Sequence, residues 1–448
     1  MRVRTGSQGP ELREIYERPA ELLQRLLRFD TSNPPGAERE CVVWVAGLLE
    51  RAGLETTFVA AEPDRPSLVA RLRGGGDAPA LMLQAHVDVV GTAGQEWTHP
   101  PFAGEIADGF IWGRGALDMK SGAAMFVAAV LRAADTGMQP AGDVVLTLLA
   151  DEEAAGDLGA AHLVRERPDL LEGVRYSLGE FGGFTLDIGG RRFYPIQVAE
   201  KQVCFMKATV RGPGGHGALP MRGGTTARLA KLLRTLERRR LPVHATPVAR
   251  QMIEQTAARL PCPAGAVLRR MLDPRWTDRV LTLLGERGSI FDPLLHNTVN
   301  ATIVRAGEKV NVIPSEATVE MDGRLLPGFT GDDMLRELGE LLGPDVELEV
   351  MRYEPGPPEA DFGLFDLLGS VLREADPTGT PIPLLLAAFT DARFFARLGI
   401  QHYGFTPMQL PFDMRFTELI HAADERVPVE AMRFGTDAVF RVLERYGR

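Results

Sequence analysis

The sequence lacks the features that mark disulfide-bonded, nucleic-acid-binding and membrane proteins. Its 448 residues include three cysteines, Cys41, Cys204 and Cys262, which are scattered and odd in number. This pattern excludes a disulfide framework, and the lack of any Cys-x-x-Cys pair argues against a structural zinc site. Scattered cysteines of this kind are typical of reduced thiols, so we expect a cytoplasmic protein.

Basic charge and long apolar runs are also lacking. The chain has 50 Lys and Arg against 60 Asp and Glu, a formal net charge of −10. Without a basic excess we expect no nucleic-acid partner. Residues 1–30 contain no uninterrupted apolar stretch, and the run at 123–131 is too short to span a bilayer. We therefore expect no signal peptide and no membrane association.

The composition is that of a folded protein long enough for two domains. In the first third, residues 81–90 and 143–150 are continuous apolar runs typical of buried parallel strands, and residues 122–134 have the pattern of a crossover helix. This β-α-β order predicts an α/β domain with a mostly parallel sheet.

After residue 200 the pattern changes to βαββαβ, which predicts a ferredoxin-like α+β domain. Residues 242–297 interrupt this second domain as an insertion that we expect to be mostly helical. Beyond a Pro- and Gly-rich linker the α/β pattern resumes. We therefore predict one discontinuous domain, formed by residues 1–197 and 354–448, with a second domain inserted at residues 198–353.

Metal-ligating residue types cluster where the predicted strands end. His86 and Asp88 are two apart near the end of an apolar run, so on a strand they would share one face. Open α/β sheets bind ligands at the carboxyl ends of their strands. A metal-binding His needs an acceptor for its other ring nitrogen, which Asp88 could supply. A solvated strand end is the alternative interpretation.

Two acidic segments allow similar interpretations. Asp118 follows a Gly-Arg-Gly turn and could bridge two cations about 3.5–4 Å apart, or serve as an ordinary helix N-cap. Met119 stands where a phosphate-binding loop requires glycine, which excludes such a loop. The run Asp151-Glu152-Glu153 also has two interpretations. It is either a solvated acidic loop, or one Glu binds metal while its neighbour accepts a proton from metal-bound water.

Three further residues are candidates only through their context. His216 lies among four glycines, which allow close approach of a ligand or another chain, Glu180 follows a strand-like run, and His421 lies near the C-terminus. Together these motifs resemble, over nearly the whole chain, the di-zinc metallopeptidases of the aminoacylase, carboxypeptidase G, acetylornithine deacetylase and succinyl-diaminopimelate desuccinylase group. The resemblance implies a zinc-peptidase α/β catalytic domain with an inserted ferredoxin-like lid or dimerisation domain.

The resemblance implies two Zn²⁺ ions per subunit, for which Co²⁺ or Mn²⁺ could substitute. Asp118 would bridge the ions, with His86 and Glu180 as ligands of one ion and Glu153 and His421 as ligands of the other.

The resemblance also implies catalytic roles. Asp88 would orient His86, and Glu152 would be the general base that activates water and then protonates the leaving amine. His216 would stabilise the tetrahedral oxyanion across a homodimer interface.

Substrate-binding residues follow from the same resemblance. Asn311 and Arg324 match the lid-domain residues that bind a substrate carboxylate, for which the bidentate fork of arginine is suited. Arg393 and Gly404 are candidate pocket residues, with a surface ion pair and a turn glycine as the alternatives. Glu at position 180 favours the aminoacylase and carboxypeptidase branches.

We therefore predict a zinc-dependent hydrolase that uses a metal-bound hydroxide to cleave the amide bond of N-acyl amino acids, or C-terminal and dipeptide bonds of short peptides. An amidohydrolase acting on a ureido compound is an alternative within the same class. A non-catalytic binding protein that keeps the fold is an alternative from another class. Such a protein is expected to lose a ligand or the base, and none is missing here.

Overall fold

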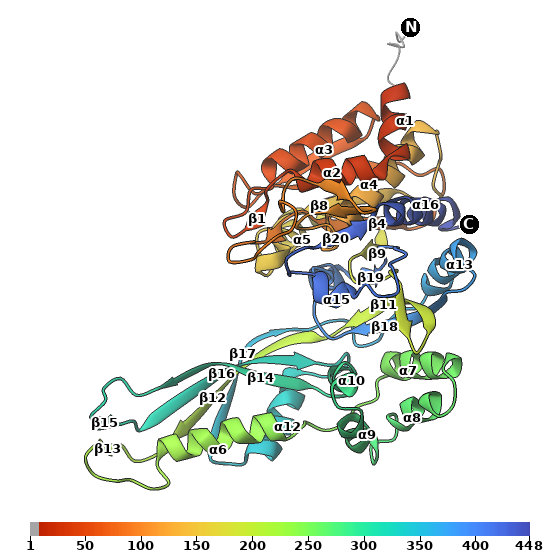
Figure 1. Cartoon of the computed structure of the whole chain (residues 1–448). Helices are drawn as coiled ribbons and strands as arrows, with labels where there is room; N and C mark the ends of the chain where they lie inside the picture. The colour runs from red at the N-terminus through yellow and green to blue at the C-terminus, as the bar shows by residue number, and fades with distance from the viewer. Residues whose placement is uncertain (1–8) are drawn as a thin grey trace. The chain divides into compact units, whose positions relative to one another are not determined.

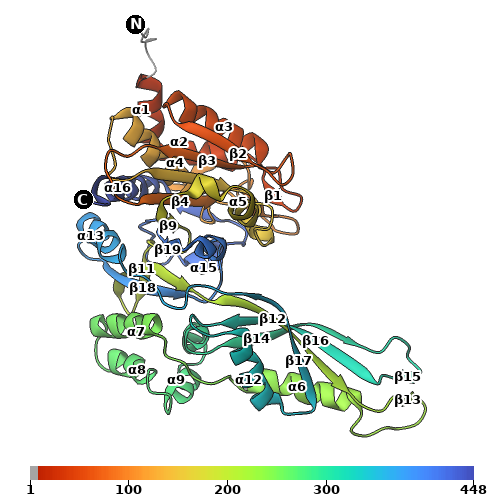
Figure 2. The same ribbon diagram turned by 180° about the vertical axis from the view of Figure 1, so that it is seen from behind.

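The structure, a computed structural model, describes residues 9–448 and forms two compact units (Figures 1 and 2). Residues 1–8, which belong to the segment where we expect no signal peptide, lie outside the described residues. The first unit contains the chain up to residue 198 together with residues 361–384 and 390–448. The second unit contains residues 199–360 and 385–389.

The second unit extends beyond the predicted segment 198–353 because later residues bond to its strands. The Gly356 N–H donates to Gln202 at 2.8 Å, and the Lys201 N–H donates to the carbonyl of Leu386 at 3.0 Å. The Arg324 guanidinium stacks on the Phe389 ring, 4.2 Å from its centroid.

The first unit is built on a nine-stranded sheet in the order β10-β11-β19-β9-β4-β8-β3-β2, with β18 paired to β11. Its four central strands are parallel neighbours: β19 (Gln401–Gly404), β9 (Val174–Gly179), β4 (Ala80–His86) and β8 (Val144–Leu149). The strands on both flanks are β2 (Glu55–Val59), β3 (Ser67–Leu72), β10 (Leu186–Ile188), β11 (Arg191–Glu200) and β18 (Thr380–Leu386). On these flanks the pairs β10–β11, β11–β19, β2–β3 and β3–β8 are antiparallel. The prediction of an α/β domain with a parallel core is thus confirmed.

The central strands form because they are apolar on both faces, and every residue of β4 and β8 is buried. The crossover helix α4 (Lys120–Asp135) is rich in Ala and is buried along nearly its whole length. It packs mainly against α1 (Gly9–Glu17), α2 (Pro19–Leu27) and α16 (Val429–Arg445). The helix α3 (Arg39–Arg51) packs against β2 and β3, and α13 (Phe365–Ala375) packs against α16.

Two small sheets join distant parts of the first unit. β1 (Ser32–Asn33) pairs with β5 (Val89–Val90) just beyond the end of β4. β20 (Arg426–Pro428) pairs with β7 (Phe110–Trp112), which in turn pairs with β6 (Glu105–Ala107). The β7–β20 pairing brings the chain that follows His421 beside the chain that leads to Asp118.

The second unit has a four-stranded antiparallel sheet in the order β14-β16-β12-β17. Its elements are β12 (Gln202–Arg211), α6 (Thr225–Arg238), β14 (Thr298–Ala306), β16 (Glu316–Leu325), α12 (Gly331–Leu342) and β17 (Val346–Glu354). Apolar side chains of α6 and α12 join those of the strands in one core. The arrangement is ferredoxin-like, as predicted from the βαββαβ order.

The insertion contains five short helices: α7 (Pro247–Arg259), α8 (Ala264–Arg270), α9 (Thr277–Leu284), α10 (Glu286–Ser289) and α11 (Asp292–Leu295). A separate two-stranded ribbon joins β13 (Gly215–His216) to β15 (Val312–Ile313). Among residues 9–448, no helix is long and apolar enough to cross a membrane.

Candidate metal centre

The candidate site lies in the first unit, at the carboxyl ends of three neighbouring parallel strands. His86 is the last residue of β4, Glu152 and Glu153 form a short turn of 3-10 helix after β8, and Glu180 directly follows β9. Parallel neighbours present their carboxyl ends at one edge of a sheet, which is where open α/β sheets bind ligands. The topology therefore gathers one imidazole and three carboxylates.

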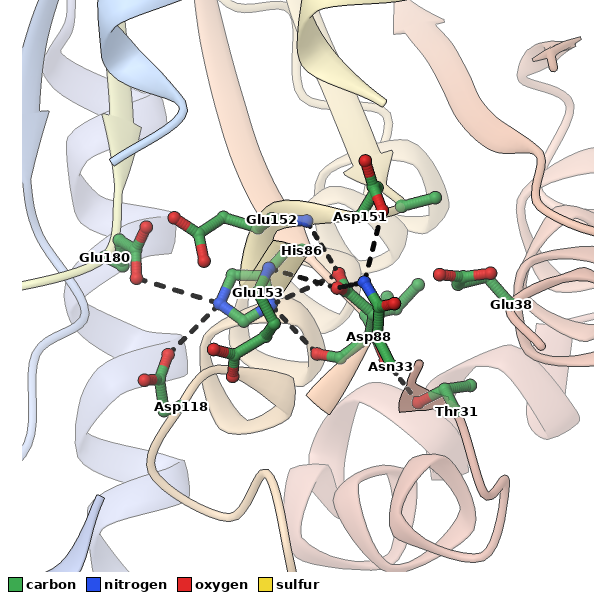
Figure 3. Close-up of polar contacts among 12 residues, drawn as sticks. Thr31, Asn33, Glu38, His86, Asp88, Asp118, Asp151, Glu152, Glu153 and Glu180 are labelled. Carbon is green, nitrogen blue, oxygen red and sulfur yellow. Dashed lines mark hydrogen bonds and ion pairs between the residues drawn. The ribbon is translucent and has the colours of Figure 1, made fainter. Parts of the chain in front are cut away.

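His86, Asp118 and Glu180 form the first potential metal-binding group (Figure 3). The His86 Nε2 lies 3.1 Å from Asp118 Oδ1 and 3.7 Å from Glu180 Oε2. One ligand atom from each of the three residues lies within 4.8 Å of the others, and all three residues are buried.

Asp118 also belongs to a second group, formed with Glu153 and His421. The His421 Nε2 lies 3.2 Å from Asp118 Oδ2 and 3.2 Å from Glu153 Oε2. Asp118 therefore faces the first group with one carboxylate oxygen and the second group with the other. This is the geometry in which a carboxylate can bridge two cations.

The electrostatics of these groups fit divalent cations. Burial raises the pKa of Glu180 to about 7 and also raises the pKa of Glu153, because carboxylate charges are desolvated there. Hydrogen bonds to Asp118 and Glu153 raise the pKa of His421 to about 10. The Glu153 Oε1 is buried and receives no hydrogen bond from the residues that the structure describes. A cation would relieve the crowded negative charge and supply the missing partner of this oxygen.

Glu152 stands apart from both groups, neither of which includes it. Its side chain extends toward Glu180 and His86 (Figure 3). Burial and the charge of Glu180 raise its pKa well above the ordinary value for a glutamate. A carboxyl group with a raised pKa, beside but outside the metal-binding groups, can accept and return a proton.

Asp88 differs from the expectation in its position. β4 ends at His86, so the two residues do not share one strand, and the His86 Nδ1 lies 3.0 Å from the carbonyl oxygen of Asp88. The Asp88 carboxylate lies 3.7 Å from that nitrogen. It accepts the backbone N–H groups of Glu152 and Glu153, both at 3.1 Å, and the side-chain amide of Asn33 at 2.9 Å. Asp88 thus contacts both the histidine and the turn that follows β8.

Three predicted residues, His216, Asn311 and Arg324, belong to the second unit, and their roles stay predictions. The structure brings two of them together, because His216 pairs with Val312 and the Gly217 N–H donates to the Asn311 carbonyl at 2.9 Å. Arg324 already binds Asp322 through Nε at 2.6 Å and Nη2 at 2.8 Å.

The two predicted pocket residues of the first unit lie in its interior. Arg393 is buried rather than in a surface ion pair, and it donates to the carbonyls of Thr390 and Ala155. Gly404 ends β19, and a Cβ atom there would lie 2.4 Å from the Glu180 carbonyl oxygen. Glycine is thus needed at 404 for the close approach of the turn that carries Glu180.

Sequence reasoning did not identify the buried charged residues that support the site. Arg65 binds Asp151 at 2.8 Å and also pairs with Glu38, while Arg114 pairs with Glu425 at 2.7 Å. Arg114 stands in the Gly-Arg-Gly motif before Asp118, and Glu425 lies four residues after His421, so closeness to predicted ligands was an available signal. Arg65 and Glu38 lie in segments without a recognisable motif.

Comparison with known proteins places this geometry in a family. The model of peptidase family M20/M25/M40 matches residues 82–445. A succinyl-diaminopimelate desuccinylase of Paracoccus denitrificans is 29% identical, covering 96% of this chain and 98% of that protein. The N-fatty-acyl-amino acid synthase/hydrolase PM20D1 of Mus musculus is 28% identical, covering 82% and 75%. A probable carboxypeptidase S-like 2 of Dictyostelium discoideum is 26% identical, covering 81% and 71%.

Solved structures share the fold at lower identity. A family M20 metallo-carboxypeptidase of Sulfolobus solfataricus has a TM-score of 0.68 at 16% identity, covering 96% of this chain and 99% of that one. Human carnosine dipeptidase 1 has a TM-score of 0.65 at 15% identity, covering 97% of each chain. A Bacillus subtilis protein described as a dinuclear metal-binding peptidase of family M20 has a TM-score of 0.57 at 12% identity, covering 96% and 98%.

Proposed function

Because the chain belongs to peptidase family M20/M25/M40 and is a metal-dependent hydrolase, we propose that it cleaves the amide bond of N-acyl amino acids at a centre of two zinc ions. The observation that carries this proposal is the position of Asp118, which belongs to both metal-binding groups while Glu152 belongs to neither. Five side chains are thereby available to hold two cations, and one carboxyl group stays available for proton transfer.

The residues divide the chemistry as follows. Bound cations would polarise the scissile carbonyl and lower the pKa of a water molecule. Glu152 accepts the proton of the attacking water and delivers it to the leaving nitrogen. Asp88 fixes the position of Glu152 by accepting its backbone N–H. His216 donates a hydrogen bond to the oxyanion that develops on the substrate.

The substrate class rests on the relatives. Two of them are named for an acyl group carried by an amino acid, an N-fatty-acyl-amino acid in one and succinyl-diaminopimelate in the other. A third is named as carboxypeptidase-like, so short peptides are the second substrate class. Asn311 and Arg324 would bind the substrate carboxylate, while Arg393 and Gly404 shape the pocket beside Glu180.

The test is the Glu152→Gln variant, assayed on a panel of N-acyl amino acids, dipeptides and N-carbamoyl amino acids with added Zn²⁺, Co²⁺ or Mn²⁺. We expect two metal ions per chain and a fall in kcat of about 10²–10⁴-fold, the usual contribution of a general acid–base residue. Glu172→Gln, which changes an exposed glutamate, serves as the control. Wild-type turnover in metal-loaded Glu152→Gln would refute the base assignment. Preference for the N-carbamoyl substrates would favour the ureido alternative.

We also propose a homodimer formed through the second unit. β14 is an edge strand of its sheet, and the apolar side chains of Ile303 and Val304 on it are 40% and 48% exposed. An exposed apolar edge strand is a template for pairing with another chain. A fully active monomer in sedimentation experiments would contradict the supply of His216 by a partner subunit. The cytoplasmic location expected from the scattered cysteines also stays part of this proposal.

A further inference from the structure

Glu425 holds the turn that carries Asp118. Its side chain is fully buried, and its Oε1 accepts the backbone N–H of Leu117 at 2.7 Å and of Asp118 at 3.1 Å. Its Oε2 accepts the N–H of Gly115 at 3.1 Å and the Arg114 Nη1 at 2.7 Å. Four donors from one five-residue turn therefore converge on a single carboxylate of the C-terminal segment.

Arg114 holds the turn that carries His421. Its side chain is 1% exposed, and besides Glu425 it donates to the backbone carbonyls of Ala422 at 3.0 Å and His421 at 3.2 Å. Its Nη2 also donates to the Gln95 Oε1 at 2.7 Å, and the Gln95 Nε2 donates to the same His421 carbonyl at 2.8 Å. The backbone of His421 has a φ of 62°, an uncommon conformation that these two donors to its carbonyl help to hold.

The two turns belong to distant parts of the chain but are fastened to each other at this point. The Gly113 N–H donates to the Glu425 carbonyl at 3.0 Å, directly beyond the β7–β20 ladder. A buried ion pair adds little net stability, because desolvation offsets the attraction between the charges. Most contacts of this pair are to main-chain groups at or next to Asp118 and His421. We therefore expect the pair to affect mainly the positions of those two residues.

We infer that the Arg114–Glu425 ion pair is a positioning device that fixes Asp118 and His421 relative to each other, and so sets the affinity for the cation that these residues share with Glu153. The inference rests on the proposed metal centre. Arg114 and Glu425 are positioning residues, since they act through the backbone of Asp118 and His421 and are in neither metal-binding group. The cation held by His86 and Glu180 depends on β4 and β9 as well, so its binding is expected to be less sensitive.

The chain offers a matched control. Arg132 on α4 donates to Asp437 on α16 at 2.7 Å, and these side chains are 33% and 49% exposed. This pair joins α4 and α16, the helices that follow the two turns, through a contact of the same length, and its contacts among the described residues do not include the metal-binding groups. Asp437→Asn therefore shows how metal binding changes when an ion pair between α4 and α16 is weakened and the two turns are left intact.

The experiment measures metal content by mass spectrometry after equilibration of full-length protein at graded, buffered concentrations of free Zn²⁺. For Glu425→Gln we expect one of the two ions to need about 10–100-fold more free Zn²⁺, the usual cost of removing a residue that supports a metal ligand. Gln95→Ala removes the contacts of Gln95 to Arg114 and to the His421 carbonyl but leaves the Arg114–Glu425 pair in place, so it is expected to shift the same ion by a smaller factor. Asp437→Asn is expected to match the wild type, and saturating Zn²⁺ is expected to restore much of the turnover.

The possible results distinguish a failure of the proposed metal centre from a failure of the positioning role of Arg114 and Glu425. Wild-type protein that binds no zinc, cobalt or manganese would sink the proposed function, and this inference with it. Wild-type protein that binds two ions, with both affinities unchanged in Glu425→Gln and Gln95→Ala, would overturn the inference alone. If circular dichroism shows that Glu425→Gln does not fold, Gln95→Ala decides: a shift of one ion supports the inference, and unchanged binding overturns it.

Discussion

The two ends of the β3–β8 strand pair carry the same kind of ion pair in different surroundings. At the end of β8 that faces the metal-binding groups, Arg65 binds Asp151 at 2.8 Å, and the side chains are 7% and 5% exposed. At the opposite end, Arg71 binds Asp143 at 2.9 Å, and the side chains are 18% and 22% exposed. Arg71 lies in β3 and Arg65 lies just before it, so the two pairs differ mainly in the end of the strands at which they lie.

The inner pair belongs to a chain of buried polar contacts that reaches the turn after β8, and Figure 3 shows the part formed by Asp151, Asn33 and Asp88. The Asn33 amide donates to Asp151 at 3.2 Å and to Asp88 at 2.9 Å, and Asp88 accepts the N–H groups of Glu152 and Glu153. The outer pair instead binds backbone groups at the opposite end of the strands: Arg71 donates to the Leu170 carbonyl, and Asp143 accepts the Gly74 N–H.

Buried ion pairs add little net stability, yet removing one partner is costly. The buried pair therefore lies beside a turn that has to be held in one position, and the partly buried pair lies at the other end of the strands, away from that turn. The difference indicates that the more deeply buried ion pair lies at the end of the strands that carries the metal-binding groups.

The largest effect is expected from Arg65→Met compared with Arg71→Met. Arg65→Met leaves Glu38 and Asp151 buried without their cation, so the free energy of unfolding should fall by about 3–5 kcal/mol. Arg71→Met leaves partly solvated groups and should cost about 1 kcal/mol or less. Urea unfolding of the two variants measures the difference. Equal losses of unfolding free energy in the two variants would contradict the comparison, because they would show that both ion pairs contribute equally to stability.

A smaller effect is expected from Asp88→Ala compared with Asp143→Ala. Asp88→Ala removes the acceptor of the Glu152 and Glu153 N–H groups, so kcat should fall by about 10–100-fold, as for other residues that support metal ligands. Asp143→Ala alters the opposite end of β8 and should leave kcat near the wild-type value. Steady-state kinetics at saturating Zn²⁺ check both values. A large kcat loss in Asp143→Ala would show that the whole strand, not its inner end, governs the turn.

The smallest effect concerns Lys201, a buried cation of the second unit that donates to the His296 carbonyl and the Thr298 hydroxyl, both at 2.8 Å. Burial, with a further contribution from the charge of Arg324, lowers its pKa to about 7. An unfolded lysine has a pKa of about 10.4, so between these values the unfolded chain binds a proton that the folded chain does not. The free energy of unfolding therefore rises with pH through this window.

Comparison of the wild type with Lys201→Met isolates this contribution, because the other titrating groups are common to both. Between pH 7 and 8.5, the free energy of unfolding of the wild type should rise by about 1–2 kcal/mol more than that of Lys201→Met. Urea titrations at the two pH values give the result. If the unfolding free energies of the two proteins changed in parallel with pH, Lys201 would keep its proton in the folded state, and the prediction would be wrong.

Much of the fold was predictable because periodicity and element order are local properties. Apolar runs identified β4 and β8, and the order of strands and helices indicated the ferredoxin-like unit. The run at 81–90 was expected to be one strand, but β4 ends at His86 and β5 begins at Val89. An apolar run shows that residues are buried, whereas the partner strand decides where a ladder stops.

The candidate site was predictable in part for the same reason. Its candidate ligands occur in motifs, at predicted strand ends for His86 and Glu153 and after a Gly-Arg-Gly turn for Asp118, so they were recognisable before any geometry was known. The partners of Arg65 and Glu425 were not predictable, although Glu425 stands close to His421 in the sequence, because Asp151 and Arg114 lie 86 and 311 residues away in the chain. Such pairs become visible only when the sheet and the β7–β20 ladder bring their segments together.

The sequence by itself determined the fold class, the family and the set of acids and histidines that can bind metal, because each depends on residue type and order. The tertiary structure decided how that set divides: Asp118 lies in both groups, Glu152 lies outside them, and Asp88 supports the turn after β8. The physical reason is that ligation depends on distances between side chains from separate strands. Those distances are set by the sheet and by buried ion pairs, which no single segment of the sequence contains.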